Sequence, residues 1–208
     1  MGVRYPASHI KVDLVPVLKD TRHGAFLIPR RYDEEWIPTW PSHDVEELNR
    51  LAKRHPPLRP AIRLLKSWKR LHEAPLSSFA LDLALRHLVG KETFADPVAL
   101  ISAFWAICAS HDRRRRLHLG AVAGDGPLTL VHSKTGEDVL AGKVAEERSL
   151  LCELSTEALV KLDEIRGRCF MGKAKWAAKG LAELFVGDEI RDEIEEIRGG
   201  NWYSGAEW

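Results

Sequence analysis

The chain has 208 residues, 45% hydrophobic and 29% charged, with 31 basic and 30 acidic side chains. This length suits one domain or two small ones, and the net charge of +1 argues against attraction of nucleic acid by the molecule as a whole. The 3 cysteines lack CxxC spacing, which argues against a disulfide framework and a cysteine-rich zinc site. Because we find neither a transmembrane-length apolar run nor a signal segment, we expect a cytoplasmic protein without a membrane partner.

The N-terminal part of the chain has the pattern of β-strands. Residues 10–17 alternate apolar and polar side chains and then become wholly apolar, and residues 24–29 form a second apolar run. The polar residues 19–23 between them predict a hairpin connection. From Ser42 onward the apolar positions recur at helical spacing, and Ser42 is available as the N-cap.

Three further helix starts are marked by residues that are typical of an N-cap or of a first helical turn. Pro60 fits the first turn of a second helix, because proline is tolerated there. Ser77 is the expected N-cap of a third helix that runs to about Gly90. Asp96, directly before a proline, is the expected N-cap of the fourth.

The C-terminal half alternates irregular and helical segments. Residues 113–126 predict a surface loop and residues 128–131 a short strand. A long helical stretch follows over 155–185, and a charged amphipathic helix over 188–198. A break in the long stretch is expected at one of its three glycines, Gly167, Gly172 or Gly180. Since strands precede helices, we expect an α+β fold, a short antiparallel sheet on a predominantly helical body.

Three residues are candidates for chemistry. Asp13 is a carboxylate inside an apolar strand, so it either meets a metal, cation or hydrogen-bond donor or points to solvent from an edge strand. Lys66 lies among leucines and a tryptophan, and its ammonium either borders a cleft or extends into solvent. Ser78 follows another serine at a helix start, where one hydroxyl suffices for capping and the other is free for a phosphate.

Five segments in chain order carry a family resemblance: IKVDLVPVL, GAFLIPRR, EEWIPTWPSHDVEELN, LRPAIRLLKSWKRL and LSSFALDLAL. They resemble the second half of a nucleotidyltransferase of the cyclic-oligonucleotide synthase (CD-NTase) and oligoadenylate synthetase superfamily, and a looser likeness continues through 135–138 and 176–185. The resemblance implies that Asp13 is the third metal-binding carboxylate. It implies that Lys66 contacts the NTP triphosphate and that Ser78 donates a hydrogen bond to a phosphate oxygen.

The resemblance also implies a domain division and a cofactor. Residues 1–40 would be part of the catalytic sheet, 41–198 a helical nucleotide-binding domain and 199–208 an aromatic tail. Nucleotidyl transfer uses two Mg²⁺ ions and needs several carboxylates. The family's Gly-Ser turn and Asp-x-Asp pair, two of its three carboxylates, are absent before Asp13. We therefore expect a truncated or split enzyme of the anti-phage type, inactive alone, that would make cyclic or linear oligonucleotide messengers from NTPs, with a second chain as one source of the missing half.

Two other functions remain open from the sequence. A non-catalytic nucleotide- or RNA-binding module would use the basic run Arg113, Arg114, Arg115 and Arg116. A helical metal-independent ribonuclease would use an Arg-x4-His pair, and three pairs have this spacing: Arg4 and His9, Arg50 and His55, Arg113 and His118.

Overall fold

The computed structural model describes residues 2–5, 10–13, 16–21, 24–29, 36–110, 130–132, 134–140 and 142–186, with backbone only for 2–5, 10–13, 37 and 174. The chain divides into two compact units, Met1–Arg50 and Leu51–Trp208, and each is described by itself. The boundary between the two units follows Arg50, which lies inside a helix. This is ten residues beyond residue 40, where the sequence predicts the boundary between the catalytic sheet and the helical domain. The functional division into 1–40, 41–198 and 199–208 stays a prediction.

The first unit contains two small antiparallel sheets. Strand β1 (Gly2–Tyr5) pairs with β2 (Ile10–Asp13), and the second sheet has the order β3 (Leu18–Asp20), β4 (Ala25–Pro29), β5 (Trp36–Thr39). A hairpin is present between β3 and β4, where Leu18 lies opposite Leu27, but its first strand lies largely in the predicted connection 19–23 and outside the predicted strand 10–17. Gly24, with φ of 63°, adopts the left-handed backbone that this turn requires.

The single strand predicted over 10–17 is wrong, because β2 ends at Asp13 and β3 begins at Leu18. Pro16, which lies between them, has no N–H to donate to a sheet and a fixed φ, so it interrupts the ladder. Helix α1 (Pro41–Arg54) follows the strands and is the first helix that the sequence predicts. It begins at Pro41, so Ser42 lies inside the helix and is not its N-cap.

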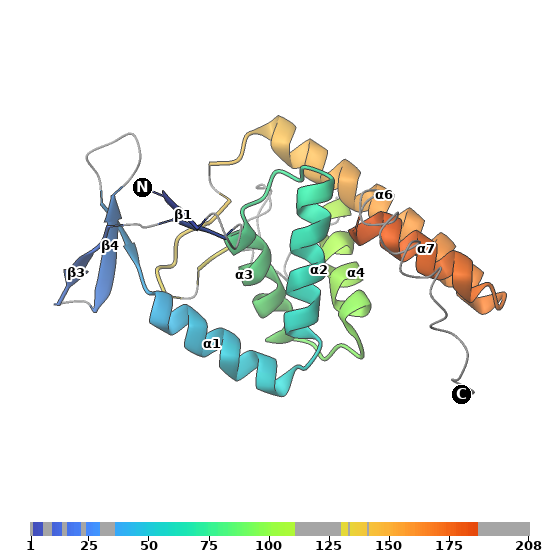
Figure 1. The fold of residues 1–208 in the computed structure, drawn as a ribbon, viewed down its shortest axis with the longest axis horizontal. Helices are drawn as coiled ribbons and strands as arrows, with labels where there is room; N and C mark the ends of the chain where they lie inside the picture. The colour runs from blue at the N-terminus through green and yellow to red at the C-terminus, as the bar shows by residue number, and fades with distance from the viewer. Residues whose placement is uncertain are drawn as a thin grey trace. The chain divides into compact units, whose positions relative to one another are not determined.

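The second unit is a helical body, shown in Figure 1. Its helices are α2 (Leu58–Leu71), α3 (Ser78–Val89), α4 (Pro97–Ala109), α6 (Ala145–Phe170) and α7 (Ala174–Phe185). The α+β class is therefore confirmed, and so are two predicted caps. The Ala80 N–H donates to the Ser77 hydroxyl at 3.0 Å, and the Ala99 N–H donates to the Asp96 carboxylate at 2.8 Å.

The long C-terminal helical stretch differs from its prediction at one end. Helix α6 begins at Ala145, ten residues before the predicted start at Ser155. The prediction missed this start because the polar first turn does not show the apolar spacing that marks the rest of the helix. The predicted break is confirmed at Gly172, whose φ of 72° ends α6 and turns the chain into α7. Figure 1 shows the two helices side by side.

In the segment between α4 and α6, only Leu130 and Val131 of the strand predicted over 128–131 are described, and a turn at residues 134–135 follows them. Among its described residues, Val131 makes only a single bridge, to Asp138. The Asp138 carboxylate accepts hydrogen bonds from the Leu130 N–H at 2.8 Å and the Leu140 N–H at 2.9 Å, which closes the turn. The predicted loop over 113–126, the helix over 188–198 and the tail lie outside the described residues.

Aromatic side chains form the centre of the helical body. Trp68 of α2 and Trp105 of α4 are at most 1% exposed, and their ring centroids are 5.4 Å apart. The Trp105 ring stacks on Phe185 of α7 at 5.8 Å. These contacts fix which face of each helix points outward. None of the described helices has an apolar stretch long enough to span a lipid bilayer.

Candidate nucleotide-binding site

Helix α2 presents a cationic outer face. Its inner face buries five apolar side chains: Leu58, Ala61, Ile62, Leu65 and Trp68. Four exposed basic residues recur at helical spacing on the other side: Arg59, Arg63, Lys66 and Arg70. Because α2 itself contains no acidic residue, this face is positively charged and would attract a polyanion such as a triphosphate.

The start of α3 offers hydrogen-bond donors. Ser77 is occupied as the N-cap, whereas Ser78 is the first residue of the helix and is exposed. The N–H groups of Ser78 and Phe79 belong to the first turn and have no acceptor within the helix. A helix start with two free N–H groups and a hydroxyl can bind a phosphate oxygen, so the pair of serines has room for both roles.

The turn over residues 130–140 packs along α3, with contacts near both ends of the helix. The Phe79 ring lies 5.6 Å from the buried His132 ring, centroid to centroid, and His87 Nε2 lies 2.8 Å from the Val131 carbonyl oxygen. The Arg86 guanidinium lies 6.0 Å from the centroid of the Phe79 ring and 3.4 Å from the Asp82 carboxylate. The loosely resembling segment 135–138 is linked to Phe79, the neighbour of Ser78, through His132, whose Nδ1 lies 3.2 Å from the Thr135 hydroxyl oxygen. Sequence reasoning missed Phe79 and His132, because no local spacing links residues so far apart.

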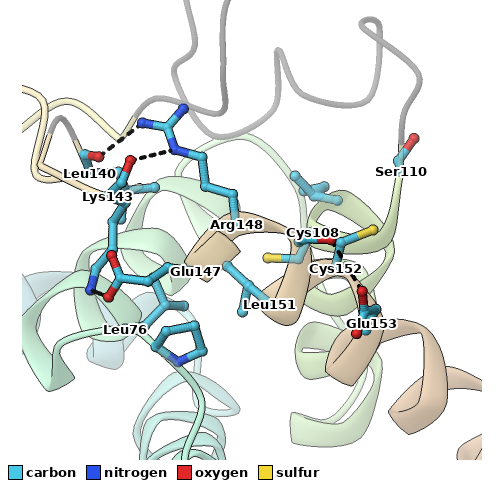
Figure 2. Close-up of a pocket in the computed structure, with 13 residues that line it drawn as sticks. Leu76, Cys108, Ser110, Leu140, Lys143, Glu147, Arg148, Leu151, Cys152 and Glu153 are labelled. Atoms are coloured by element: carbon cyan, nitrogen blue, oxygen red, sulfur yellow. Dashed lines mark hydrogen bonds and ion pairs between the residues drawn. The ribbon is translucent and has the colours of Figure 1, made fainter. Parts of the chain in front are cut away.

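A cavity of about 350 Å³ lies next to the start of α3 (Figure 2). Pro75 and Leu76, which precede Ser77, form one wall, and the ends of α4 and α6 form the others. Arg148 donates to the Lys143 carbonyl at 3.1 Å and to the Leu140 carbonyl at 3.2 Å, so it holds the segment before α6 in place. Lys66 and Ser78 do not line this cavity.

Charges in the cavity wall are largely paired with one another. The Lys143 ammonium lies 2.6 Å from the Glu147 carboxylate, which also accepts from the Val144 N–H at 3.2 Å. The hydrogen bond from Lys143 lowers the pKa of Glu147, and the Val144 bond and the lysine charge add to this despite some opposing desolvation. Glu147 therefore stays ionised at neutral pH, and its pairing leaves Lys143 a weak candidate for phosphate binding.

A buried thiol closes the cavity from the α4 side. Burial raises the pKa of Cys108 to about 12; a hydrogen bond with Ser155 lowers it and the neighbouring Cys152 raises it further. Because the thiolate is the reactive form, we expect Cys108 in the folded chain to resist iodoacetamide at pH 8, while the exposed Cys169 is alkylated. Peptide mass spectrometry before and after addition of urea measures this, and labelling of native Cys108 as fast as Cys169 would contradict it.

The free energy of unfolding should also fall as the pH rises from the ordinary thiol pKa of 9.0 to about 12, because in this pH range only the unfolded chain ionises Cys108.

The predicted metal ligand Asp13 is the last residue of β2, opposite Gly2 of β1. Its side chain lies outside the described part of the structure, so its role as a Mg²⁺ ligand stays a prediction. A carboxylate oxygen is a donor that Mg²⁺ prefers, and in that respect the residue fits the ion.

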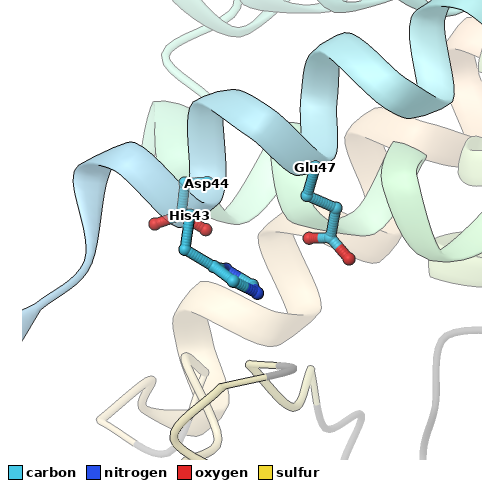
Figure 3. Close-up of side chains that lie close together, drawn as sticks. All are labelled: His43, Asp44 and Glu47. Carbon is cyan, nitrogen blue, oxygen red and sulfur yellow. The ribbon is translucent and has the colours of Figure 1, made fainter. Parts of the chain in front are cut away.

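The described residues contain one other group that could hold a metal ion, on α1 (Figure 3). Ligand atoms of His43, Asp44 and Glu47 lie within 4.8 Å of one another. An imidazole with two carboxylates suits transition metals better than Mg²⁺, which takes oxygen ligands. Glu47 also lies 4.0 Å from the Arg50 guanidinium, so the cluster does not supply the missing magnesium carboxylates.

Two solved structures share the fold of this chain. CdnC from E. coli MS115-1 with ATP superposes with a TM-score of 0.65 and 19% identity over 90% of this chain and 63% of CdnC. A complex of CdnC with HORMA-deltaN gives a TM-score of 0.62 and 16% identity over 90% of this chain and 62% of that one. CdnC is a CD-NTase. The fold of this chain is CD-NTase-like. The superfamily resemblance read from the sequence is thus confirmed at the level of the fold, and the chain spans less than two thirds of the CdnC chains.

The CD-NTase-like fold is not accompanied by matches in sequence. No protein-family model matches the chain, and a search of curated proteins finds no match. The CD-NTase likeness therefore rests on the arrangement of helices and strands. It supports a nucleotidyltransferase-like fold and leaves substrate, product and partner as proposals.

The residues of the two other predicted functions lie mostly outside the described part. This applies to the RNA contact through 113–116 and to His118 of the ribonuclease pattern. Of the three Arg-x4-His pairs, only Arg50 and His55 have described side chains. Arg50 lies inside α1, four residues before its end, and His55 immediately follows the helix.

Proposed function

We propose that this chain is the nucleotide-binding portion of a nucleotidyltransferase that joins NTPs into cyclic or linear oligonucleotide messengers, as in anti-phage signalling. The observation that carries the proposal is the exposed cationic face of α2, with Lys66 at its centre, in a chain with a CD-NTase-like fold. A triphosphate is a compact polyanion, and charge-assisted hydrogen bonds to lysine and arginine are among the strongest that proteins make. CdnC, which has a similar fold, is solved with ATP, and that supports an NTP as the ligand.

Two residues divide the work of phosphate binding in this proposal. Lys66 acts as a mobile point charge on the triphosphate, because its ammonium extends from a helix whose opposite face is fixed by Trp68. Ser78 donates its hydroxyl to a phosphate oxygen, and the adjacent N–H groups of the α3 start add donors aligned with the helix dipole. Both interactions orient the triphosphate, and neither requires the residue to lose a proton.

Catalysis would need groups beyond these 208 residues. In the proposal Asp13 would hold one of two Mg²⁺ ions, whose chemistry when bound would be Lewis-acid activation of a hydroxyl and neutralisation of phosphate charge. One carboxylate cannot hold two divalent ions, so the remaining ligands come from a further stretch of polypeptide or from a second chain. The structure of CdnC in complex with HORMA-deltaN makes a protein partner reasonable, and we include one in the proposal.

Calorimetric titration of the chain with ATP and MgCl₂ tests the proposal. We expect Lys66→Ala to weaken ATP binding about tenfold, since a charge-assisted contact is lost at an exposed site. Ser78→Ala should weaken it severalfold and leave stability unchanged. Its matched partner Ser77→Ala should lower the free energy of unfolding by about 1 kcal/mol through loss of the cap. Lys53→Ala, on an exposed part of α1, is the charge control.

Unchanged ATP affinity in Lys66→Ala would contradict the proposal. An equal loss of ATP affinity in the Lys53→Ala control would also contradict it, because the effect would then come from the net charge of the chain and not from the position of Lys66. If Ser77→Ala weakened ATP binding more than Ser78→Ala, the result would show that helix capping by Ser77 matters for ATP binding and that the Ser78 hydroxyl does not.

A further inference from the structure

The hairpin that joins α6 to α7 exposes three large apolar side chains at its tip. Phe170 is 94% exposed, Met171 is 61% exposed and Trp176, in the first turn of α7, is 57% exposed. The space around the tip is open: a Cβ added to Gly167 or Gly172 would meet no heavy atom within 4 Å among the described residues. The tip, defined here as residues 166–179, therefore presents its large apolar side chains to solvent, and Ala177 is its one described apolar side chain that belongs to the core.

The same tip is basic. The sequence has no acidic residue from Ile165 to Ala182 and five basic ones: Arg166, Arg168, Lys173, Lys175 and Lys179. The two arginines pair with acids one helical turn earlier, Arg166 with Asp163 at 3.4 Å and Arg168 with Glu164 at 3.9 Å.

The three lysines have no acidic partner in the described part of the chain, and the Lys179 ammonium lies 5.9 Å from the centre of the Trp176 ring. In the sequence, lysines without an acidic partner among the described residues therefore follow Phe170 and Met171 and flank Trp176.

We propose that the α6–α7 tip binds the surface of a membrane that contains anionic phospholipids. Phe170 and Met171 would enter the boundary between headgroups and acyl chains. Trp176 would lie at the interface, where its amphipathic ring is favoured, and the lysines would meet the lipid phosphates. Contact of this kind is peripheral, so it requires no spanning helix and agrees with the absence of one from the described helices. It differs from our expectation from the sequence that no membrane is involved, and the experiment below decides between the two.

The shape and composition of the tip favour a lipid surface over nucleic acid. Single-stranded nucleic acid is usually held in a groove whose aromatic rings stack on successive bases. Here the apolar residues sit at the end of a projecting hairpin, and one of them, Met171, offers no ring for stacking. The Trp176 ring also has a lysine near its centre. Exposed apolar side chains that alternate in the sequence with basic ones fit a flat, anionic, deformable surface.

Sedimentation of the full chain with vesicles tests this proposal. We expect binding to vesicles of equal parts phosphatidylglycerol and phosphatidylcholine and none to phosphatidylcholine alone. The combined variant Phe170→Ser, Met171→Ser should reduce partitioning at least tenfold. The combined variant Lys173→Gln, Lys175→Gln should also reduce it by more than tenfold, because each lysine near an anionic surface contributes about fivefold.

The matched controls are Val160→Ser, a 57% exposed apolar residue elsewhere on α6, and Lys53→Gln, an exposed lysine outside the tip. Both should bind anionic vesicles as the unchanged chain does, and circular dichroism confirms the fold of each variant.

Each contrary outcome overturns the proposal in a recognisable way. Absence of vesicle binding refutes it, and so does binding that the tip variants leave unchanged. Binding of a fluorescent single-stranded RNA that the tip variants abolish, without vesicle binding, would assign the tip to nucleic acid. A concentration-dependent dimer in sedimentation velocity, lost in the Phe170 and Met171 variant, would assign it to a second copy of the chain. None of these outcomes depends on ATP binding, so the proposal can fail independently of the proposed function.

Discussion

Replacing Trp68 with alanine should lower the free energy of unfolding by about 3–5 kcal/mol, the usual cost of removing a buried tryptophan. The Trp68 side chain is 1% exposed, and the centroid of its ring lies 5.4 Å from that of Trp105 and 5.8 Å from that of His72. It joins α2 to α4 at the centre of the helical body. Loss of the ring removes the hydrophobic contribution and leaves a cavity that neighbouring side chains fill only in part. Urea denaturation followed by circular dichroism measures the loss as a lower midpoint.

Trp176→Ala is the matched control for this experiment, because it deletes the same side chain at an exposed position. It should change the free energy of unfolding by less than about 0.5 kcal/mol. Similar losses for the two variants would show that the Trp68 contacts do not form the centre of the core. The comparison also bears on the site, since burial of Trp68 fixes the face of α2 from which Lys66 extends.

Two helix starts and one helix end were predictable because their signals are local. Ser77 and Asp96 cap α3 and α4 as the sequence indicated, and the left-handed Gly172 ends α6. Each of these features depends on a few neighbouring residues whose chemistry satisfies backbone groups or permits one conformation. The same local reasoning extended one strand across Pro16, where the missing N–H should have divided it.

Long-range features were not predictable from the same signals. The β1–β2 pairing joins segments whose spacing carries no turn motif, and the contact between Phe79 and His132 joins residues far apart in the chain. Helix α6 begins at a polar turn that hydrophobic periodicity does not mark. For the candidate site, the helical pattern of α2 sufficed to place Lys66 outside the core. The position of Asp13 relative to Lys66 stays a prediction, because it depends on tertiary arrangement.

Introducing valine at Gly180 should lower the free energy of unfolding by about 3 kcal/mol, although glycine is itself a poor helix former. Helices α6 and α7 approach so closely there that a Cβ on Gly180 would lie 2.6 Å from Cγ1 of Ile165, a residue that is 3% exposed. Gly167→Val is the matched control, because a Cβ there meets no heavy atom within 4 Å, and we expect a change below about 0.5 kcal/mol. Urea denaturation of both variants measures the difference, and equal effects would contradict it. In an Ile165→Ala background the added cost of Gly180→Val should largely vanish, because the atoms that clash are gone, and this double-mutant cycle separates close packing from helix propensity.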